Sequence, residues 1–199
     1  MKYLALALAL LTVNAHARDP GYQWLDLGYT YHEADSGGLE IETQQVDLDL
    51  AIDFGDGNTS TPEDFYLRLA VARSTADVEL NGVDLGDLDG TTYAMLVGGR
   101  ITFAQSTDWF FEVGGMRLDI EDFSDETYAF NTGIRSARGP FDLKLQVGLR
   151  GETDLTDDTI ITSVEAEYFF LEQLAVGAGV AYDNGLDDQV YRVHMSYHY

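Results

Sequence analysis

Charged side chains recur at every second position along much of the chain, where they could pair as ions or form a lining that selects ions. Facing carboxylates and basic groups in a poorly solvated space pair with one another, because an isolated buried charge is costly. Around an open passage the same groups would select the ions that pass. The near balance of six cations and seven anions favours pairing. The basic members are Arg68, Arg100, Arg135, Lys144, Arg150 and Arg192, and the acidic members are Asp26, Asp47, Asp49, Asp53, Glu112, Glu165 and Glu167.

Catalysis has weak support in the sequence. There is no G-x-S-x-G segment and no phosphate-binding loop. His32 is the histidine expected at an outer rim, beside Glu33 and Asp35 and with Asp183 as a candidate partner across the fold. A lone histidine without partner spacing is more often a surface residue than a general base. We therefore expect neither an enzyme nor a cofactor, and a rim site around His32 is the alternative that stays open.

The charged positions alternate with bulky apolar ones, a period of two that is typical of extended strands. Examples are residues 46–54, residues 141–149 and the final stretch VYRVHMSYHY. About ten such stretches of roughly 9 to 12 residues are present, which is the length that a tilted strand needs to cross a bilayer. The stretch at 109–113 loses its phase near Met116 and Arg117, where we expect a bulge or a strand end.

The segments between these stretches alternate in character. One set is short and carries turn-forming residues. The other set is acidic, contains no Lys or Arg, and holds 21 of the 35 Asp and Glu residues, in segments 33–42, 77–89, 119–126, 152–158 and 183–188. Such a rim would attract Ca²⁺ or Mg²⁺ loosely, although ordinary solvation of the charges is the alternative. DLGDLDG lacks the spacing of a calcium loop, so no defined metal site is expected.

The composition of the two strand faces indicates what surrounds each. A predicted strand carries about four or five bulky apolar residues, more than a small barrel can enclose. The opposite face mixes charges with glycine and alanine, which would leave room for arginine and tyrosine side chains in a narrow lumen. We therefore expect the apolar set to face lipid and the charged set to form a lumen charge network. Aromatic residues near the strand ends, Trp24 among them, would form interfacial girdles.

The N-terminal residues 1–17 have the layout of a secretory signal peptide, with Lys2, an apolar run, and Ala15 and Ala17 before the predicted cleavage. Residues 18–199 are expected to form one domain. The chain has no cysteine, so burial and backbone pairing must hold the fold. Its formal charge of −24 argues against nucleic acid as a partner.

The signal peptide, the amphipathic strands and the aromatic C-terminal strand resemble the small outer-membrane β-barrels of Gram-negative bacteria, the OmpA-like and porin-like group. We expect an all-β, antiparallel, up-and-down transmembrane barrel of ten strands, or of eight if residues 109–138 fold differently. The resemblance implies that the last strand closes the barrel on the first and is read by the barrel-assembly machinery. That strand carries His194 and His198 on its polar face, and Tyr191, Val193, Met195, Tyr197 and Tyr199 on its apolar face.

The expected function is non-enzymatic: a structural or surface-exposed protein of the cell outer membrane, with a charge-paired lumen and at most a narrow cation-preferring pore. Its partners would be outer-membrane lipid and lipopolysaccharide, with loosely bound divalent cations. Three alternatives stay open, namely a general diffusion porin, an outer-membrane hydrolase of the omptin or lipid-deacylase type, and a secreted soluble β-domain. The sequence names no ligand, adhesion partner or oligomeric state.

Overall fold

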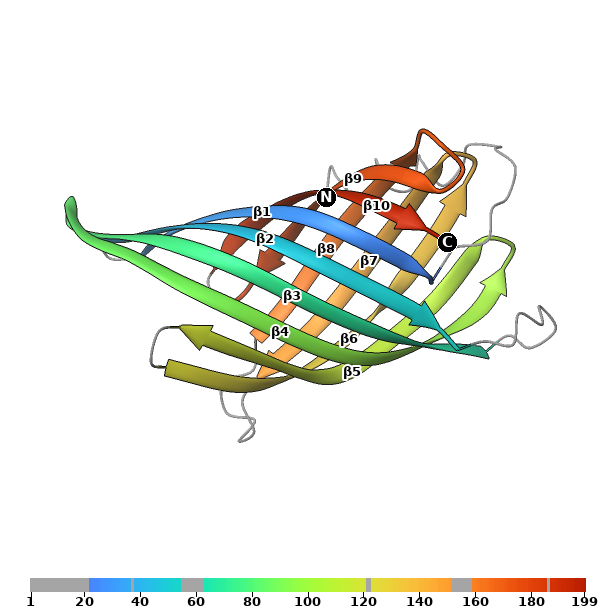
Figure 1. Cartoon of the computed structure of the whole chain (residues 1–199), viewed down its shortest axis with the longest axis horizontal. Coiled ribbons are helices and arrows are strands. Elements are labelled where there is room, and N and C mark those ends of the chain that lie inside the picture. Colours follow the sequence, from blue (N-terminus) through green and yellow to red (C-terminus); the bar gives the residue numbers. More distant parts are fainter. Residues whose placement is uncertain (1–21, 37, 55–62, 121–122, 152–158, 186) are drawn as a thin grey trace.

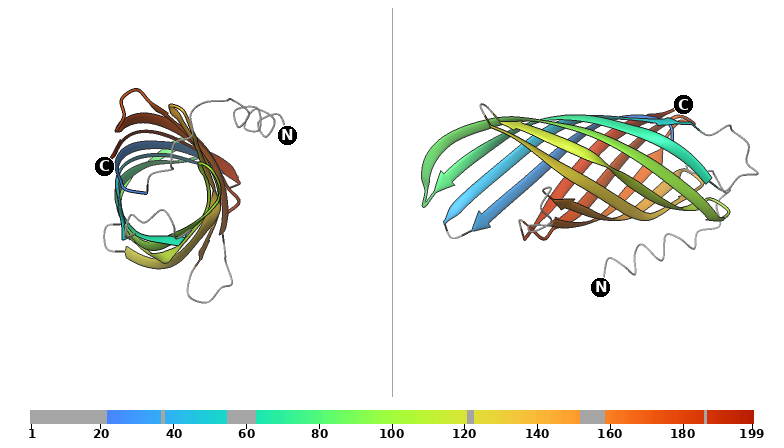
Figure 2. Two further views of the ribbon diagram at one scale, coloured as in Figure 1. Left: turned by 90° about the vertical axis from the view of Figure 1, so that its right-hand side faces the viewer. Right: turned by 90° about the horizontal axis from the view of Figure 1, so that it is seen from below.

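The computed structural model describes residues 22–36, 38–54, 63–120, 123–151, 159–185 and 187–199, and the predicted signal peptide at 1–17 lies outside these ranges. The described residues form ten antiparallel strands in one sheet. Each strand pairs with the next, and β10 pairs with β1, so the sheet closes into a barrel (Figure 1 and Figure 2). The strands are β1 (Trp24–Ser36), β2 (Leu39–Asp53), β3 (Glu63–Leu80), β4 (Val83–Ala104), β5 (Thr107–Ile120), β6 (Phe123–Arg138), β7 (Phe141–Gly151), β8 (Thr159–Phe169), β9 (Leu174–Asp183) and β10 (Asp188–His198).

The closed barrel confirms the all-β fold and the prediction of ten strands, and the eight-strand alternative is wrong. No helix in the described part of the chain is both long and apolar enough to span a membrane. The chain enters β1 and leaves β10 at one end of the barrel, which we call the terminal end. The opposite end, where β1 is followed by β2 and β3 by β4, is called the hairpin end.

The seam of the barrel is the pairing of β1 with β10. Its register runs from Trp24 opposite His198 to His32 opposite Val190. The predicted closure of the barrel by the terminal strand is therefore confirmed. The apolar face of this strand points away from the lumen, with Tyr191, Val193, Met195, Tyr197 and Tyr199 all exposed.

Side-chain exposure separates the two faces of the strands. On the outer face, Leu48 and Val113 are 45% and 54% exposed. On the inner face, Asp49 and Glu112 are buried. A sheet that exposes its bulky apolar residues and buries its charges has the arrangement of a transmembrane barrel rather than of a water-soluble one.

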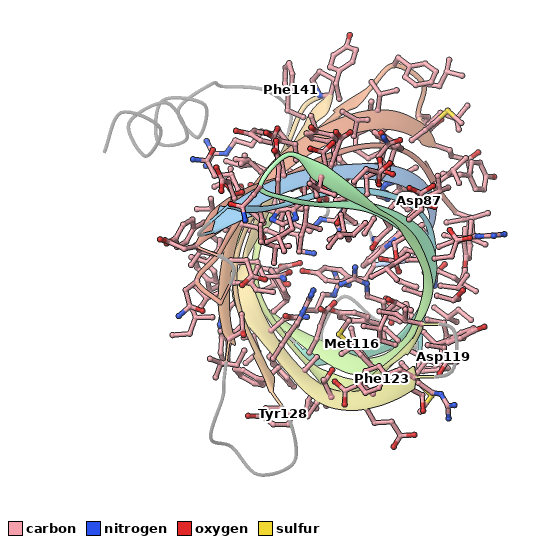
Figure 3. All side chains as sticks on the ribbon, turned by 90° about the vertical axis from the view of Figure 1, so that its left-hand side faces the viewer. Asp87, Met116, Asp119, Phe123, Tyr128 and Phe141 are labelled. Carbon is pink, nitrogen blue, oxygen red and sulfur yellow. The ribbon has the colours of Figure 1, made fainter. Side chains whose placement is uncertain are left out.

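Aromatic residues lie on both faces of the wall. Figure 3 looks into the barrel from the hairpin end and shows Met116 pointing into the lumen, while Tyr128 and Phe141 point away from it. The assignment of Trp24 to an outer girdle is wrong, because Trp24 is buried inside the barrel. It lies two residues before Asp26 and so shares the inner face of β1.

The hairpin of β3 and β4 extends far beyond the predicted strand length (Figure 1). Residues 77–89 were expected to form a loop, but they continue both strands up to a two-residue turn. Asn81 and Gly82 form this turn with φ angles of 52° and 77°. Two positive φ angles define a type I′ turn, which matches the twist of the flanking strands, and Asn-Gly is its preferred sequence.

The expected interruption of β5 near residue 116 is also wrong. The pairing of β5 with β4 and with β6 keeps its register through Met116 and Arg117. Met116 faces the lumen, whereas Arg117 is exposed and contacts Asp119 at 2.8 Å. The outer face therefore turns polar toward the hairpin end without any change of phase, because the strand there has passed the apolar band.

The acidic segments 33–42 and 119–126 also consist mainly of strand residues, whereas 152–158 lies outside the described residues. As a result, acidic side chains of β1 to β4 stand directly opposite one another in two rows near the hairpin end. Within one row, a hydrogen bond and the charge of Asp77 raise the pKa of Asp87 above the usual range of aspartate. We call the two rows the acidic rows. They comprise Glu33, Glu42, Asp77 and Asp87 in one row, and Asp35, Glu40, Glu79 and Asp84 in the other.

Candidate functional site: the lumen charge network

The charged residues singled out in the sequence share the inner face of the barrel. Most of them line the two lumen cavities or pair with residues that do, and Arg100 pairs with the buried carboxylate of Asp108. Asp53 follows Asp49 by four residues and so lies on the same side of β2. The other twelve are Arg68, Arg100, Arg135, Lys144, Arg150, Arg192, Asp26, Asp47, Asp49, Glu112, Glu165 and Glu167.

Glycine residues make the space that these side chains occupy. A Cβ atom at Gly28 would lie 2.6 Å from the guanidinium group of Arg192 and from the carboxylate of Asp47. A Cβ atom at Gly98 would collide with the ring of Tyr66. The expectation that small inward residues leave room for arginine and tyrosine is confirmed at these positions.

Arg192 on β10 contacts carboxylates on three other strands, two of which lie across the seam. Its Nη2 donates to Asp26 Oδ1 on β1 at 2.6 Å and to Asp47 Oδ2 on β2 at 2.7 Å. Its Nη1 lies 3.7 Å from Glu165 Oε2 on β8. Since the guanidinium group is planar and has five donors, it can hold several carboxylates at once.

Arg68 on β3 forms a second bridge inside the lumen, between carboxylates of β2 and β5. Its Nε donates to Asp49 Oδ2 at 2.7 Å, and its Nη1 donates to Glu112 Oε2 on β5 at 3.1 Å. Glu112 also accepts hydrogen bonds from Tyr66 Oη at 3.0 Å and from Asn131 Nδ2 at 2.8 Å. The carboxylate of Glu112 is fully buried and surrounded by donors, which is how a buried charge is tolerated.

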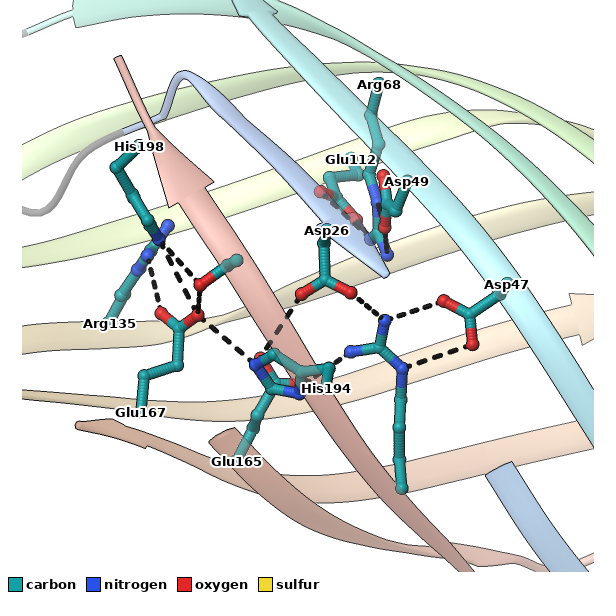
Figure 4. A network of polar contacts seen from close by, with 12 residues as sticks. Asp26, Asp47, Asp49, Arg68, Glu112, Arg135, Glu165, Glu167, His194 and His198 are labelled. Atoms are coloured by element: carbon teal, nitrogen blue, oxygen red, sulfur yellow. Dashed lines mark hydrogen bonds and ion pairs between the residues drawn. The ribbon is translucent and has the colours of Figure 1, made fainter. Parts of the chain in front are cut away.

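Glu167 on β8 is the centre of a third cluster, which contains residues that the sequence argument left out. Arg135 donates to its Oε2 at 3.3 Å and Ser196 to its Oε1 at 2.6 Å. His194 Nε2 and His198 Nε2 lie 3.2 Å and 3.6 Å from Oε1 (Figure 4). Two histidines of the last strand therefore belong to the network.

Period two could have identified the residues that were missed. His194 and Ser196 follow Arg192 at steps of two, and Asp142 precedes Lys144 by two, so all of them share an inner face. What the sequence could not supply is the partner of His194 and Ser196, because Glu167 lies on β8, which is neither adjacent to β10 in sequence nor paired with it.

The terminal end of the lumen is filled by aromatic rings. Tyr22, Trp24 and Tyr66 lie together, with ring centroids 5.0 to 6.2 Å apart. Arg100 and Arg135 stack on Tyr22 at 5.0 and 5.3 Å, which is a favourable cation–π geometry. The guanidinium group of Arg100 also lies 3.4 Å from the buried carboxylate of Asp108.

The hairpin half of the lumen is more open than the terminal half. A cavity of about 350 Å³ there is bounded by small residues such as Ala70, Ala94 and Ala181. Lys144 and Arg150 line it too, and no hydrogen bond or ion pair joins either of them to another described residue. Lys144 instead lies over the ring of Phe110 at 5.2 Å. Among the described residues, direct ion pairs therefore join four of the six basic residues of the network to carboxylates, namely Arg68, Arg100, Arg135 and Arg192.

His32 does not lie on the surface as expected. It is buried on the inner face of β1, and its Nε2 lies 3.8 Å from Asp188 Oδ2. Glu33 points to the outer face and accepts a hydrogen bond from Tyr31 Oη. No nucleophile or hydrogen-bonded base accompanies His32 among the described residues, so the geometry offers no support for a rim active site.

The closed barrel, its apolar outer face and its charged interior define a small outer-membrane β-barrel. No protein-family model matches the chain, and no curated protein matches its sequence. Several solved structures share the fold. The NanC porin aligns with a TM-score of 0.54 and 11% identity, over 88% of this chain and 100% of that one. The KdgM porin aligns with a TM-score of 0.53 and 10% identity, over 88% and 99%. The transport unit of the autotransporter AIDA-I from Escherichia coli gives 0.53 and 12%, over 100% and 96%.

Proposed function

We propose that the protein is an integral outer-membrane barrel whose lumen is closed to ion flow and whose hairpin end faces the cell exterior. The observation that carries this proposal is the set of ion pairs that project from the wall into the lumen. Arg68 on β3 reaches Glu112 on β5, and Arg192 on β10 reaches Glu165 on β8, each over one intervening strand. Paired charges that fill a narrow lumen occupy the path that a hydrated ion would need.

The arrangement of space along the barrel axis supports the same proposal. The cavity of about 350 Å³ lies in the hairpin half, and below it a space of only about 40 Å³ is left among the ion pairs. The buried rings of Tyr22, Tyr66 and Phe110 fill the next layer. These layers support a lumen that is open at the hairpin end and closed at the terminal end.

The alternatives gain less support from the geometry. A general diffusion porin needs an open water-filled passage, which the paired charges oppose. A soluble β-domain would place Leu48 and Val113 in water, at a large hydrophobic cost. A hydrolase would need a nucleophile and a base in contact near His32, and no hydrogen bond joins His32 to another described residue.

Export and assembly form part of the proposal. Residues 1–17 would be removed as a signal peptide, and the terminal strand would be recognised by the barrel-assembly machinery. In the membrane, the outer face would contact lipid, and the hairpin end would lie at the level of lipopolysaccharide. The acidic rows there would be screened by loosely bound divalent cations.

Single-channel recording in planar bilayers tests the closed lumen. The protein is purified from membranes, its folded state is verified by the shift in gel mobility on heating, and an open porin is inserted in parallel as a control. The native protein should give no conductance steps. The double variant Arg68→Ala/Glu112→Ala, which removes one bridge completely, should give small steps. Regular steps from the native protein would contradict the proposal.

A further inference from the structure

The cluster around Glu167 and Arg192 carries more negative than positive charge. Five carboxylates are shared between two guanidinium groups, with Asp26, Asp47 and Glu165 at Arg192 and Asp142 and Glu167 at Arg135. Lys144 lines the same small cavity and offsets one further charge. With the imidazole rings of His194 and His198 neutral, an excess of two negative charges is left in a largely desolvated space, where uncompensated charge is costly. One divalent cation would balance it.

Three potential metal ligands converge within this cluster, because one ligand atom each of Asp26, Glu167 and His194 lie within 4.8 Å of one another. The Nε2 atom of His194 lies 3.2 Å from Glu167 Oε1 and 3.6 Å from Asp26 Oδ2. In a tetrahedral site with metal–ligand bonds of 2.0 to 2.1 Å, neighbouring ligand atoms are about 3.3 Å apart. Glu165 approaches from one side, with its Oε1 3.9 Å from the same nitrogen, and would complete the site by moving toward the ion.

One ligand residue is buried and directs a carboxylate oxygen at this point. Asp26 is 5% exposed, and its Oδ1 accepts the hydrogen bond from Arg192. No described residue donates a hydrogen bond to its Oδ2, which lies 3.6 Å from His194 Nε2. The carboxylates of Asp26, Glu165 and Glu167 also line the neighbouring space of about 40 Å³, which they share with basic side chains and which His194 does not line. That volume can hold an ion or a water molecule.

We propose that Asp26, Glu165, Glu167 and His194 bind one divalent cation of the Zn²⁺ class inside the lumen. One imidazole nitrogen with carboxylate oxygens suits Zn²⁺, whereas Mg²⁺ prefers an octahedral set of oxygen ligands. The ligands come from β1, β8 and β10, so the cation would tie both strands of the seam to a third strand. This inference goes beyond the proposed function, because a closed lumen does not require a metal.

Metal binding is measured on the refolded barrel in detergent after treatment with EDTA and dialysis. Titration with Co²⁺ should produce the visible absorption of tetrahedral Co²⁺, and Zn²⁺ should displace it at one equivalent. Zn²⁺ should also raise the temperature at which the folded gel band disappears, and EDTA should reverse that shift. His194→Gln should weaken Co²⁺ binding by about 100-fold or more, since it removes a direct ligand.

Two further variants make the test decisive. Glu165→Gln changes the most exposed of the four ligands, so it decides the matter if His194→Gln does not fold. It should weaken binding by about 10-fold or more. His32→Gln removes another buried lumen histidine and should leave binding unchanged. The proposal is overturned if the native barrel takes up neither metal at millimolar concentration, if folded His194→Gln or Glu165→Gln binds as the native protein does, or if His32→Gln weakens binding equally. None of these results alters the conductance test.

Discussion

Gly177 on β9 lies directly opposite His194 on β10, and its missing side chain is the space in which the imidazole ring sits. A Cβ atom at Gly177 would collide with that ring. The backbone carbonyl of Ala166 lies on the same side, so the ring has little freedom to move away. The position of His194 beside Glu167 therefore depends on a glycine in the neighbouring strand.

We expect Gly177→Ala to destabilise the barrel by about 1 to 3 kcal/mol, as overpacking of a filled interior does. Unfolding in urea, followed by the heat-sensitive gel shift, measures this change. Gly115→Ala is the matched control, because a Cβ atom there would have Thr127 O at 3.8 Å as its nearest neighbour. Equal effects of the two substitutions would show that the His194 ring is not confined as described.

Arg68→Met should destabilise the protein by about 3 to 5 kcal/mol, because it leaves the carboxylates of Asp49 and Glu112 buried without their cation. The same change at Arg73, whose side chain is 76% exposed and lies 3.7 Å from Asp89, should cost less than about 1 kcal/mol. Denaturant unfolding of both variants provides the comparison. A small effect at Arg68 would indicate that water replaces the guanidinium group in the lumen.

An arginine at Val113, in the middle of β5, should cost about 2 to 4 kcal/mol in lipid vesicles, the penalty for a charge facing the bilayer centre. Leu85→Arg is the control, because Leu85 is equally exposed but lies in the extension of β4 near the hairpin end. Reversible unfolding from vesicles distinguishes the two. If both substitutions were harmless, the outer face would not contact lipid.

Asp87 should titrate above the usual pKa of aspartate, about 3.9, since Asp77 raises it. The protonated form is then favoured by the folded hairpin. Its stabilisation is full below the usual pKa and is lost as the pH rises through the raised pKa. Nuclear magnetic resonance titration of the Asp87 carboxyl carbon tests this, with amide exchange across residues 83–89 reporting on hairpin stability. Asp77→Asn should return Asp87 toward the usual pKa, and a native Asp87 that already titrates there would refute the pairing.

The fold could be predicted because alternation along a strand is a local property of the sequence. The period of two places Leu48 outside and Asp49 inside without any knowledge of the neighbouring strands. The number of strands follows from counting such stretches, and the closing role of the last one was implied by the resemblance to outer-membrane barrels. The end of the β3–β4 hairpin was predicted wrongly as a loop because its acidic residues were taken to indicate one. Asn81 and Gly82 are a direct signal for a type I′ turn.

The site could be predicted only as a set of inward charges. Which charges pair depends on the tilt of the strands and on the width of the lumen. Neither quantity can be derived from the positions that face inward. Lys144 and Arg150 accordingly lack ion pairs to described residues, whereas His194 and Ser196 gained partners on β8. Trp24 was misplaced for a different reason, since its girdle assignment followed residue type although the period of two places it on the same face as Asp26.

Arg192 is separated in sequence from Asp26 by 166 residues and from Asp47 by 145. A polypeptide truncated before β10 would keep both carboxylates and Glu167 but lose Arg192, His194 and Ser196. The carboxylates in its interior would repel one another, and the edge of β1 would have no partner strand. Only a chain that includes β10 brings Arg192 to these carboxylates, so premature termination would leave a species that proteolytic surveillance could distinguish by its failure to close.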